Sequence, residues 1–324
     1  MLLGPNTKKI EQIFAESKHI GQNEVALFAI FDRNTKEASF VTHGPITTSN
    51  VLRLGSITKI FLAYVALKAG LPLEKTVAEI MPELAGPSYA GSDRITFRQL
   101  LNHTAGIVNY SKLPGAQDFV GEYNPAVTVD LGWKDRPLLF EPGTQWHYSN
   151  TNSEVVAMAV EKISGKKIKA LIDEACSEIA PTLTLDTGAA QPYPLEAPGY
   201  ANFKMPWSFP SASGRLIGTP LDALRAIDTI STTNEWKLMQ SWATAPKRTP
   251  DPGYDPAGGD KYGFYLQEFD FGATKAIGHD GHIHVTSVIA TTDDRVFLIH
   301  TSSDVDTCDW MPLSKQIISA ALEK

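Results

Sequence analysis

The tetrapeptide Ser56-Ile57-Thr58-Lys59 combines side chains suited to nucleophilic catalysis. On a helix, positions three apart lie on the same face, so the Lys59 amine can reach the Ser56 hydroxyl. A serine hydroxyl is a weak nucleophile until a neighbouring base takes its proton. The first turn of a helix also favours the negative charge that develops there. The spacing therefore predicts acyl transfer through Ser56.

The same spacing occurs a second time, at Ser164-Gly165-Lys166-Lys167. That copy lies beside a glycine and two lysines, which is typical of a solvated helix end. The first copy instead opens a segment that is apolar on nearly all sides, predicted as a buried helix over 56–69. Its context therefore favours Ser56 and Lys59 over an accidental pair on a core helix, where an unpartnered lysine would be costly.

Two further tripeptides could complete such a site. Tyr148-Ser149-Asn150 offers a phenol for proton transfer and an amide to orient substrate. The alternative is a core tyrosine followed by an asparagine that caps a helix. Tyr200-Ala201-Asn202 has the same spacing, but no apolar helix follows it.

His279-Asp280-Gly281 is predicted on a strand near the C-terminus, where a backbone N–H beside Gly281 and that of Ser56 would form an oxyanion hole. A similar tripeptide, His19-Ile20-Gly21, precedes the first predicted strand and is not favoured.

Three nearby histidines, His279, His282 and His284, raise the alternative of a zinc site. No carboxylate or thiol spacing completes a ligand set, so we expect neither a metal nor a cofactor. His103 is expected to hydrogen-bond loop backbone rather than to catalyse. Cys176 and Cys308 are expected to be two separate thiols.

Hydrophobic periodicity places β-rich runs near both ends of the chain and helices between them. Strands are expected at 25–31, 38–42, 262–269, 274–277, 285–291 and 296–301, and helices at 7–17, 56–69, 153–163 and 310–322. This order predicts an α/β (α+β) fold, with a central antiparallel sheet built from both termini and flanked by helices. We expect a single domain over 1–324, with a sheet lobe at approximately 1–55 and 240–324 and a mostly helical lobe at approximately 56–239.

The composition restricts the partners. A net charge of −7 argues against general affinity for nucleic acid or an anionic membrane. No window approaches the ~18 apolar residues of a membrane span. No signal peptide is evident, so a cytoplasmic location is expected, or a periplasmic or secreted one if a leader was removed. The oligomeric state is not predicted.

Five blocks together resemble the class C β-lactamase-like, penicillin-binding-protein-like superfamily, which includes DD-peptidases, D-amino-acid amidases, esterases and transacylases. In chain order they read LRLGSITKIFLAYVAL, ITFRQLLNHTAGI, EPGTQWHYSNTN, SASGRLIGTPLDALRAI and IGHDG. The resemblance implies a β-lactamase/transpeptidase-like fold. It also implies that Ser56 is the nucleophile and that Lys59 shares or accepts its proton.

By the same resemblance, Tyr148 acts as general base and then as acid. Asn150 holds the substrate's amide or the lysine, and His279 lines the site. The backbone N–H groups of Ser56 and His282, next to Gly281, form the oxyanion hole.

The expected function is a serine hydrolase or acyltransferase that cleaves an ester, amide or lactam of a small-molecule acyl substrate. His282 and His284 stand where the superfamily commonly has small residues, which disfavours ordinary penicillins. An esterase, amidase or biosynthetic acyltransferase is therefore preferred. The alternatives are a true β-lactamase or D-Ala-D-Ala carboxypeptidase, and a non-catalytic ligand-binding protein of the same fold.

Irregular segments are expected to determine specificity, because loops on a rigid scaffold usually carry it. These are residues 110–140 and the proline-rich 181–214. Trp146, Trp207 and Phe209 are candidates to line a substrate pocket, and core packing explains them equally well.

Overall fold

The structure is a computed structural model that describes residues 3–4, 6–18, 20, 24–116, 124–186, 212–246, 261–282, 285–302 and 310–323. Its centre is a six-stranded antiparallel sheet in the order β2-β1-β9-β8-β7-β6. The strands are β1 (Ala26–Asp32), β2 (Ala38–His43), β6 (Gln267–Asp270), β7 (Lys275–His282), β8 (Val285–Thr291) and β9 (Arg295–Ser302). The first two strands and the last four thus form one sheet, which confirms the predicted architecture.

Both faces of this sheet are covered, as strand β1 illustrates. Leu27, Ala29 and Phe31 point into one hydrophobic core, and Ala26 and Phe28 point into another. Successive side chains of a strand point to opposite faces, so a strand buried throughout must have a layer on each side. The uninterrupted apolar run of β1 is therefore explained by two helical layers.

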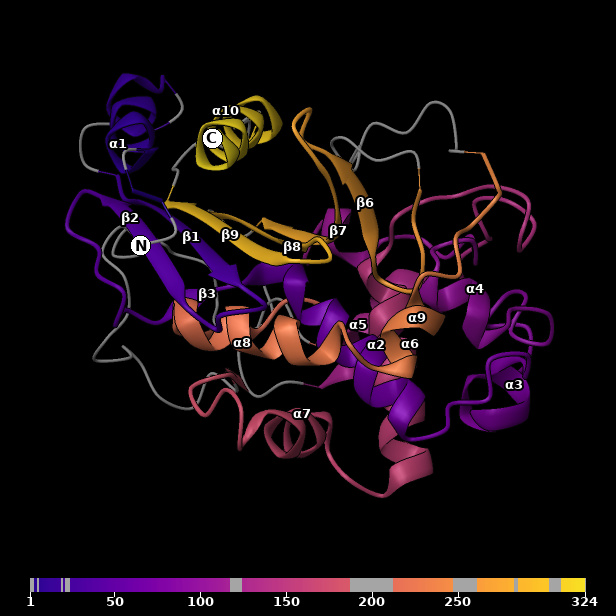
Figure 1. Cartoon of the computed structure of the whole chain (residues 1–324). Helices are drawn as coiled ribbons and strands as arrows, with labels where there is room; N and C mark the ends of the chain where they lie inside the picture. Colours follow the sequence, from indigo (N-terminus) through magenta and orange to yellow (C-terminus); the bar gives the residue numbers. More distant parts are fainter. Residues whose placement is uncertain are drawn as a thin grey trace.

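Figure 1 shows these two layers. The terminal helices α1 (Asn6–Glu16) and α10 (Trp310–Leu322) lie together above the sheet. Below it lie α2 (Thr58–Lys68), α6 (Asn150–Ser164) and α8 (Pro220–Ile230). The expected terminal helices are confirmed.

Smaller helices complete the lower layer. They are α3 (Val77–Ile80), α4 (Phe97–Leu101), α5 (Pro125–Trp133), α7 (Ile168–Cys176) and α9 (Asn234–Met239), with 3₁₀ turns η1 (Gly55–Ile57), η2 (Pro82–Leu84) and η3 (Tyr110–Lys112). Helix α6 begins three residues before the expected 153, because Ser149 is the extended N-cap residue. Helix α6 ends, as expected, at a left-handed Gly165.

Three sequence-based predictions of elements need correction. The strand expected over 262–269 is reduced to β6, because Tyr265 adopts a φ of 54°. The backbone N–H groups of Phe264 and Tyr265 donate to Met239 and Leu101 instead of to a strand. These donors therefore anchor a turn on the ends of α9 and α4.

The other two corrections concern the segments expected to be irregular. Residues 110–140 contain α5, whose Trp133 is buried. Thr184–Leu185 form strand β4, which pairs with β5 (Leu216–Gly218). Strand β5 also pairs with β3 (Leu52–Arg53), making a small second sheet that the sequence analysis missed. Residues 117–123 and 187–211, with Trp207 and Phe209, lie outside the described residues.

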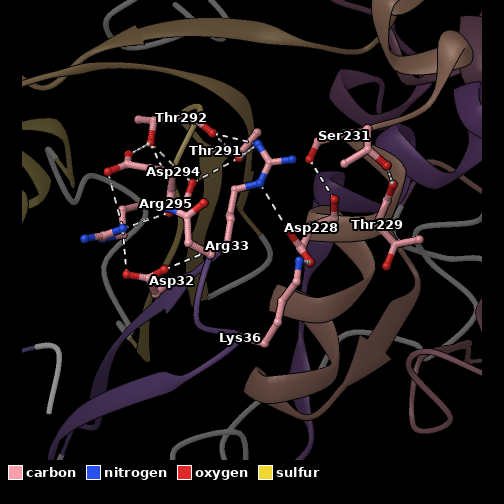
Figure 2. Close-up of polar contacts among 12 residues, drawn as sticks. Asp32, Arg33, Lys36, Asp228, Thr229, Ser231, Thr291, Thr292, Asp294 and Arg295 are labelled. Atoms are coloured by element: carbon pink, nitrogen blue, oxygen red, sulfur yellow. Dashed lines mark hydrogen bonds and ion pairs between the residues drawn. The ribbon is translucent and has the colours of Figure 1, made fainter.

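A polar cluster joins α8 to one end of the main sheet (Figure 2). The guanidinium Nε of Arg33 lies 3.1 Å from Asp228 Oδ1, and its Nη1 donates to the carbonyl of Thr292. Lys36 reaches the other carboxylate oxygen of Asp228 at 2.8 Å. Because the Arg33 and Asp228 side chains are only 15% and 10% exposed, water screens this pair weakly.

None of the helices in the described part of the chain has the length and apolar character that crossing a bilayer requires.

The Arg33–Asp228 pair gives a stability prediction. Asp228→Asn should lower the free energy of unfolding by about 1–3 kcal/mol, because it leaves a half-buried guanidinium without its charge partner. Urea denaturation measures the change. As a control, Glu174→Gln removes the exposed pair with Lys166, whose side chains are 57% and 52% exposed. That change should stay within about 0.5 kcal/mol, and equal losses in the two variants would contradict the prediction.

Candidate active site

The nucleophile candidate Ser56 lies in the 3₁₀ turn η1, directly before helix α2. This turn is fixed from both sides, since the Thr58 hydroxyl donates to the Gly55 carbonyl and accepts from the Leu216 amide. Gly55 adopts a φ of 53°, a conformation that favours glycine. The helix predicted from 56 therefore begins at Thr58, and Ser56 sits half-buried on the turn that leads into it.

Three of the predicted residues meet at one atom, the Ser56 hydroxyl oxygen. The Lys59 amine lies 3.0 Å from Ser56 Oγ and also donates to the Ser213 carbonyl at 2.6 Å. The Tyr148 hydroxyl lies 2.9 Å from the same Oγ. Because Lys59 and Tyr148 both touch the serine oxygen, Ser56 can exchange a proton with either group.

Burial sets the acid–base properties of these groups. The Lys59 side chain is fully buried, and this lowers its pKa to about 7, although the carboxylates of Glu154 and Asp280 act in the opposite direction. Burial raises the pKa of the Tyr148 phenol well above its ordinary value, which the hydrogen bond to Ser56 partly offsets. Near neutral pH the phenol therefore keeps its proton, whereas the lysine is poised between its two forms.

Tyr148 is held by a cluster of rings around His103. The His103 ring lies 4.5 Å from that of Tyr148, and its Nδ1 accepts from Asn152 and from the Ser149 amide. Its carbonyl accepts from the His147 amide. His103 thus fixes the backbone on both sides of Tyr148, which confirms that it bonds loop backbone.

Asn150 is the first residue of α6 and not its cap, so the capping alternative is wrong. Its amide nitrogen donates to the Ser111 hydroxyl at 3.0 Å, and its backbone N–H donates to the Asn109 side chain. The structure therefore places Asn150 beside η3, and its Nδ2 points to Ser111. Its predicted role toward substrate or lysine stays a prediction.

His279 lies on β7, as predicted, but its side chain is fully buried. Its Nε2 lies 2.9 Å from the Tyr262 hydroxyl, and Nδ1 contacts the Asp280 carbonyl. Burial lowers the pKa of His279 to about 4, so the ring is neutral at physiological pH. The Tyr262 ring in turn packs 5.3 Å from that of Trp146. His279 therefore belongs to the same buried cluster of rings as Tyr262.

Gly281 brings the backbone of β7 against the turn that carries Ser56. A Cβ on Gly281 would lie 2.2 Å from the Leu54 carbonyl oxygen and 2.9 Å from the Ser56 nitrogen. A Cβ on Gly55 would lie 3.1 Å from the His282 nitrogen. The backbones that carry the two nitrogens predicted to form the oxyanion hole therefore pack so closely at Gly55 and Gly281 that a larger side chain would have to displace them.

His282 itself is 38% exposed and directs its ring to Asp280 Oδ2 at 2.9 Å and to Thr286. His284, Tyr200, Asn202, His19, Gly21 and Cys308 lie outside the described residues. Within those ranges, no group of three His, Cys, Asp or Glu side chains is arranged to hold a metal ion. The second S-x-x-K copy, at Ser164, lies at the solvated end of α6 as expected. Cys176 is a free, buried thiol.

The Beta-lactamase family model matches residues 10–307, which include every element of this site. This chain belongs to the Beta-lactamase family.

Two solved structures show the same fold as this Beta-lactamase family protein. One is the D-amino acid amidase from Ochrobactrum anthropi SV3 complexed with L-phenylalanine amide, with a TM-score of 0.79, 18% identity and 98% of each chain covered. The other is the D-stereospecific amidohydrolase from Streptomyces sp., with a TM-score of 0.76, 22% identity, and 99% of this chain and 98% of that chain covered. At this level of identity, the likeness shows the fold.

A curated relative is the probable fimbrial assembly protein FimD, serogroup H1, of Dichelobacter nodosus. It is 26% identical over 151 residues, which are 43% of this chain and 36% of the relative. The matched stretch thus spans about a third of that protein's length.

The sequence analysis did not single out Glu154, Asp280 or Ser213 as functional, although all three act on Lys59. The sequence could have indicated Glu154, because it lies four positions after Asn150 and therefore on the same face of the helix as Asn150. An acidic residue in a helix otherwise rich in Val and Ala is unusual and suggests a function. Ser213 acts through its backbone carbonyl, which no side-chain pattern reveals.

The close contact at Gly281 gives a prediction for Ser56. Gly281→Ala should slow covalent labelling of Ser56 by a fluorophosphonate by about 100-fold, because the added Cβ separates β7 from the Ser56 turn. Intact mass spectrometry measures the rate. Gly272→Ala is the control, since a Cβ on Gly272 would meet no atom within 4 Å, although the positive φ of Gly272 disfavours alanine. Labelling of Gly281→Ala at the wild-type rate would contradict the steric argument.

Proposed function

We propose that this protein is a serine amidase or esterase that forms an acyl-enzyme on Ser56 and transfers the acyl group to water. The observation that carries the proposal is the joint contact of Lys59 and Tyr148 with Ser56 Oγ, at 3.0 and 2.9 Å. A hydroxyl bonded to both a titratable amine and a protonated phenol has a proton acceptor and a proton donor within reach.

The acylation step follows from the two pKa directions. The neutral Lys59 amine takes the Ser56 proton as Oγ attacks the substrate carbonyl carbon. The backbone N–H groups of Ser56 and His282 stabilise the oxyanion of the tetrahedral intermediate. As the intermediate collapses, the Tyr148 phenol gives its proton to the leaving amine or alcohol, which leaves Lys59 as the ammonium and Tyr148 as the phenolate.

Deacylation reverses these proton transfers. Water attacks the ester carbonyl, its proton passes to the Tyr148 phenolate, and Ser56 Oγ leaves with a proton from the Lys59 ammonium, so that all three groups return to their starting forms. No metal or cofactor is required for this sequence. An acceptor other than water would turn the same chemistry into acyl transfer.

Amides and esters of small amino acids are the proposed substrate class. The solved relatives named above are a D-amino acid amidase and a D-stereospecific amidohydrolase, and this supports amides of D-amino acids as the first candidates. The imidazole of His282, beside the proposed oxyanion nitrogen, favours a narrow acyl donor over a bulky fused lactam.

The test is the intact mass of the protein after brief exposure to a p-nitrophenyl ester, followed by turnover of paired D- and L-amino acid amides. We expect one acyl adduct on the wild type, none on Ser56→Ala, and a rate at least 100-fold lower for Tyr148→Phe. No adduct on the wild type would indicate a binding protein. Hydrolysis of a penicillin or a D-Ala-D-Ala peptide in preference to amides would replace the proposed substrate class.

The pH dependence follows from Lys59. Because the neutral amine must accept the proton and burial lowers its pKa to about 7, kcat/KM should rise as pH increases through about 7 and then level off. Well below pH 6, the rate should fall about tenfold per pH unit. Rates between pH 5 and 9 measure the profile. A flat profile, or one that declines through neutrality, would exclude Lys59 as the base.

A further inference from the structure

Lys59 is a fully buried amine whose two hydrogen-bond partners carry no charge. They are the Ser56 hydroxyl and the Ser213 carbonyl. An ammonium with only neutral partners in a protein interior is costly, because it loses the solvation that water gave it. The charged groups near Lys59 therefore decide how often the amine is protonated.

Two carboxylates act on Lys59 from different elements. Glu154 belongs to α6 and Asp280 belongs to β7, and both side chains are 0% exposed. Both favour the protonated lysine and oppose the effect of burial. Fully buried carboxylates are rare, so two around one lysine call for an explanation beyond packing.

Glu154 is linked to Lys59 through a single residue. The Ser213 amide donates to Glu154 Oε1 at 3.2 Å, and the Ser213 carbonyl accepts from Lys59 at 2.6 Å. The two peptide groups that flank Ser213 thus point an N–H to the carboxylate and a carbonyl oxygen to the ammonium. Loss of the Glu154 charge would weaken this alignment as well as the direct attraction.

Asp280 is held on β7 by two neighbouring side chains. Its Oδ1 accepts from the Gln267 amide at 2.8 Å, and its Oδ2 contacts His282 Nε2 at 2.9 Å. It follows His279, whose neutral ring supplies no charge, and precedes Gly281. The strand that carries the proposed oxyanion nitrogen therefore also carries a buried carboxylate.

The other titratable groups that face Lys59 are neutral. Burial lowers the pKa of His103 well below its ordinary value and that of His279 to about 4. Tyr148, whose ring centroid lies 5.0 Å from the Lys59 amine, keeps its proton. In the described part of the chain, the charges that act on Lys59 are thus those of Glu154 and Asp280.

We propose that Glu154 and Asp280 are positioning residues that stabilise the Lys59 ammonium and so set the pH at which Ser56 becomes reactive. Neither needs to touch the substrate, because each acts through the lysine. The consequence for the reaction rate rests on the proposed acylation of Ser56, whereas the effect on Lys59 itself does not.

The direct test is a titration of Lys59 by NMR in protein labelled with ¹³C at the lysine Cε. The Lys59 signal is assigned by its loss in Lys59→Arg. In Glu154→Gln and in Asp280→Asn, the midpoint should each fall by roughly one pH unit, because the ammonium loses an attractive charge. The pH at half-maximal fluorophosphonate labelling of Ser56 should move in the same direction.

Two variants serve as controls. Glu154→Asp keeps the charge and should hold the midpoint within about 0.3 pH units of the wild type. Asp228→Asn neutralises a buried carboxylate at the far cluster of Figure 2 and should leave the Lys59 midpoint unchanged.

The amide substitutions are isosteric and keep an acceptor for Ser213 and Gln267, and circular dichroism checks that each variant folds. Unchanged midpoints in both amide variants would overturn the proposal. Shifted midpoints without labelling of Ser56 at any pH would support it and refute the proposed acylation.

Discussion

The burial of one ammonium group is the constraint on which the rest of the site depends. Helix α2 is apolar on nearly all sides and lies inside the molecule, so the Lys59 side chain is fully buried. Its charge is tolerated only because Ser213, Glu154 and Asp280 come from three other parts of the chain to meet it. The proposed reaction depends on the same burial, because it lowers the pKa of Lys59 to about 7 and a lysine that titrates near neutral pH can exchange a proton with a serine.

The second constraint is the contact between two backbones. Gly55 and Gly281 let the Ser56 turn and β7 approach more closely than any side chain would permit. This contact joins β7 to the turn at the start of α2. The same backbone contact therefore holds the Ser56 turn against the sheet and sets the geometry of the proposed oxyanion hole. A change in the packing at this contact would change the oxyanion hole as well.

The phenol of Tyr148 is held in place by His103 and a group of buried rings. His103 has a φ of 60°, unusual for a residue other than glycine, and from this position it bonds the backbone on both sides of Tyr148. The Tyr262 ring packs against the rings of both His103 and His279. This layer of neutral, buried rings keeps the phenol protonated and in one place, which proton donation to a leaving group requires.

The sequence by itself determined the sheet assembled from both termini and the buried helix after Ser56, and it singled out Ser56, Lys59 and Tyr148, because apolar periodicity and short motifs are local signals. Only the tertiary structure decided which charges surround Lys59. Glu154 and Asp280 are far apart in the chain, and the link through Ser213 runs through backbone atoms, which no residue type reports. The turn at Tyr265 was likewise not evident from the sequence, because the residue types around it are typical of strands. Their backbone N–H groups bond to the ends of α4 and α9 instead of to a neighbouring strand. Local patterns reveal which groups are present, whereas their pKa values depend on the burial and neighbours that folding alone supplies.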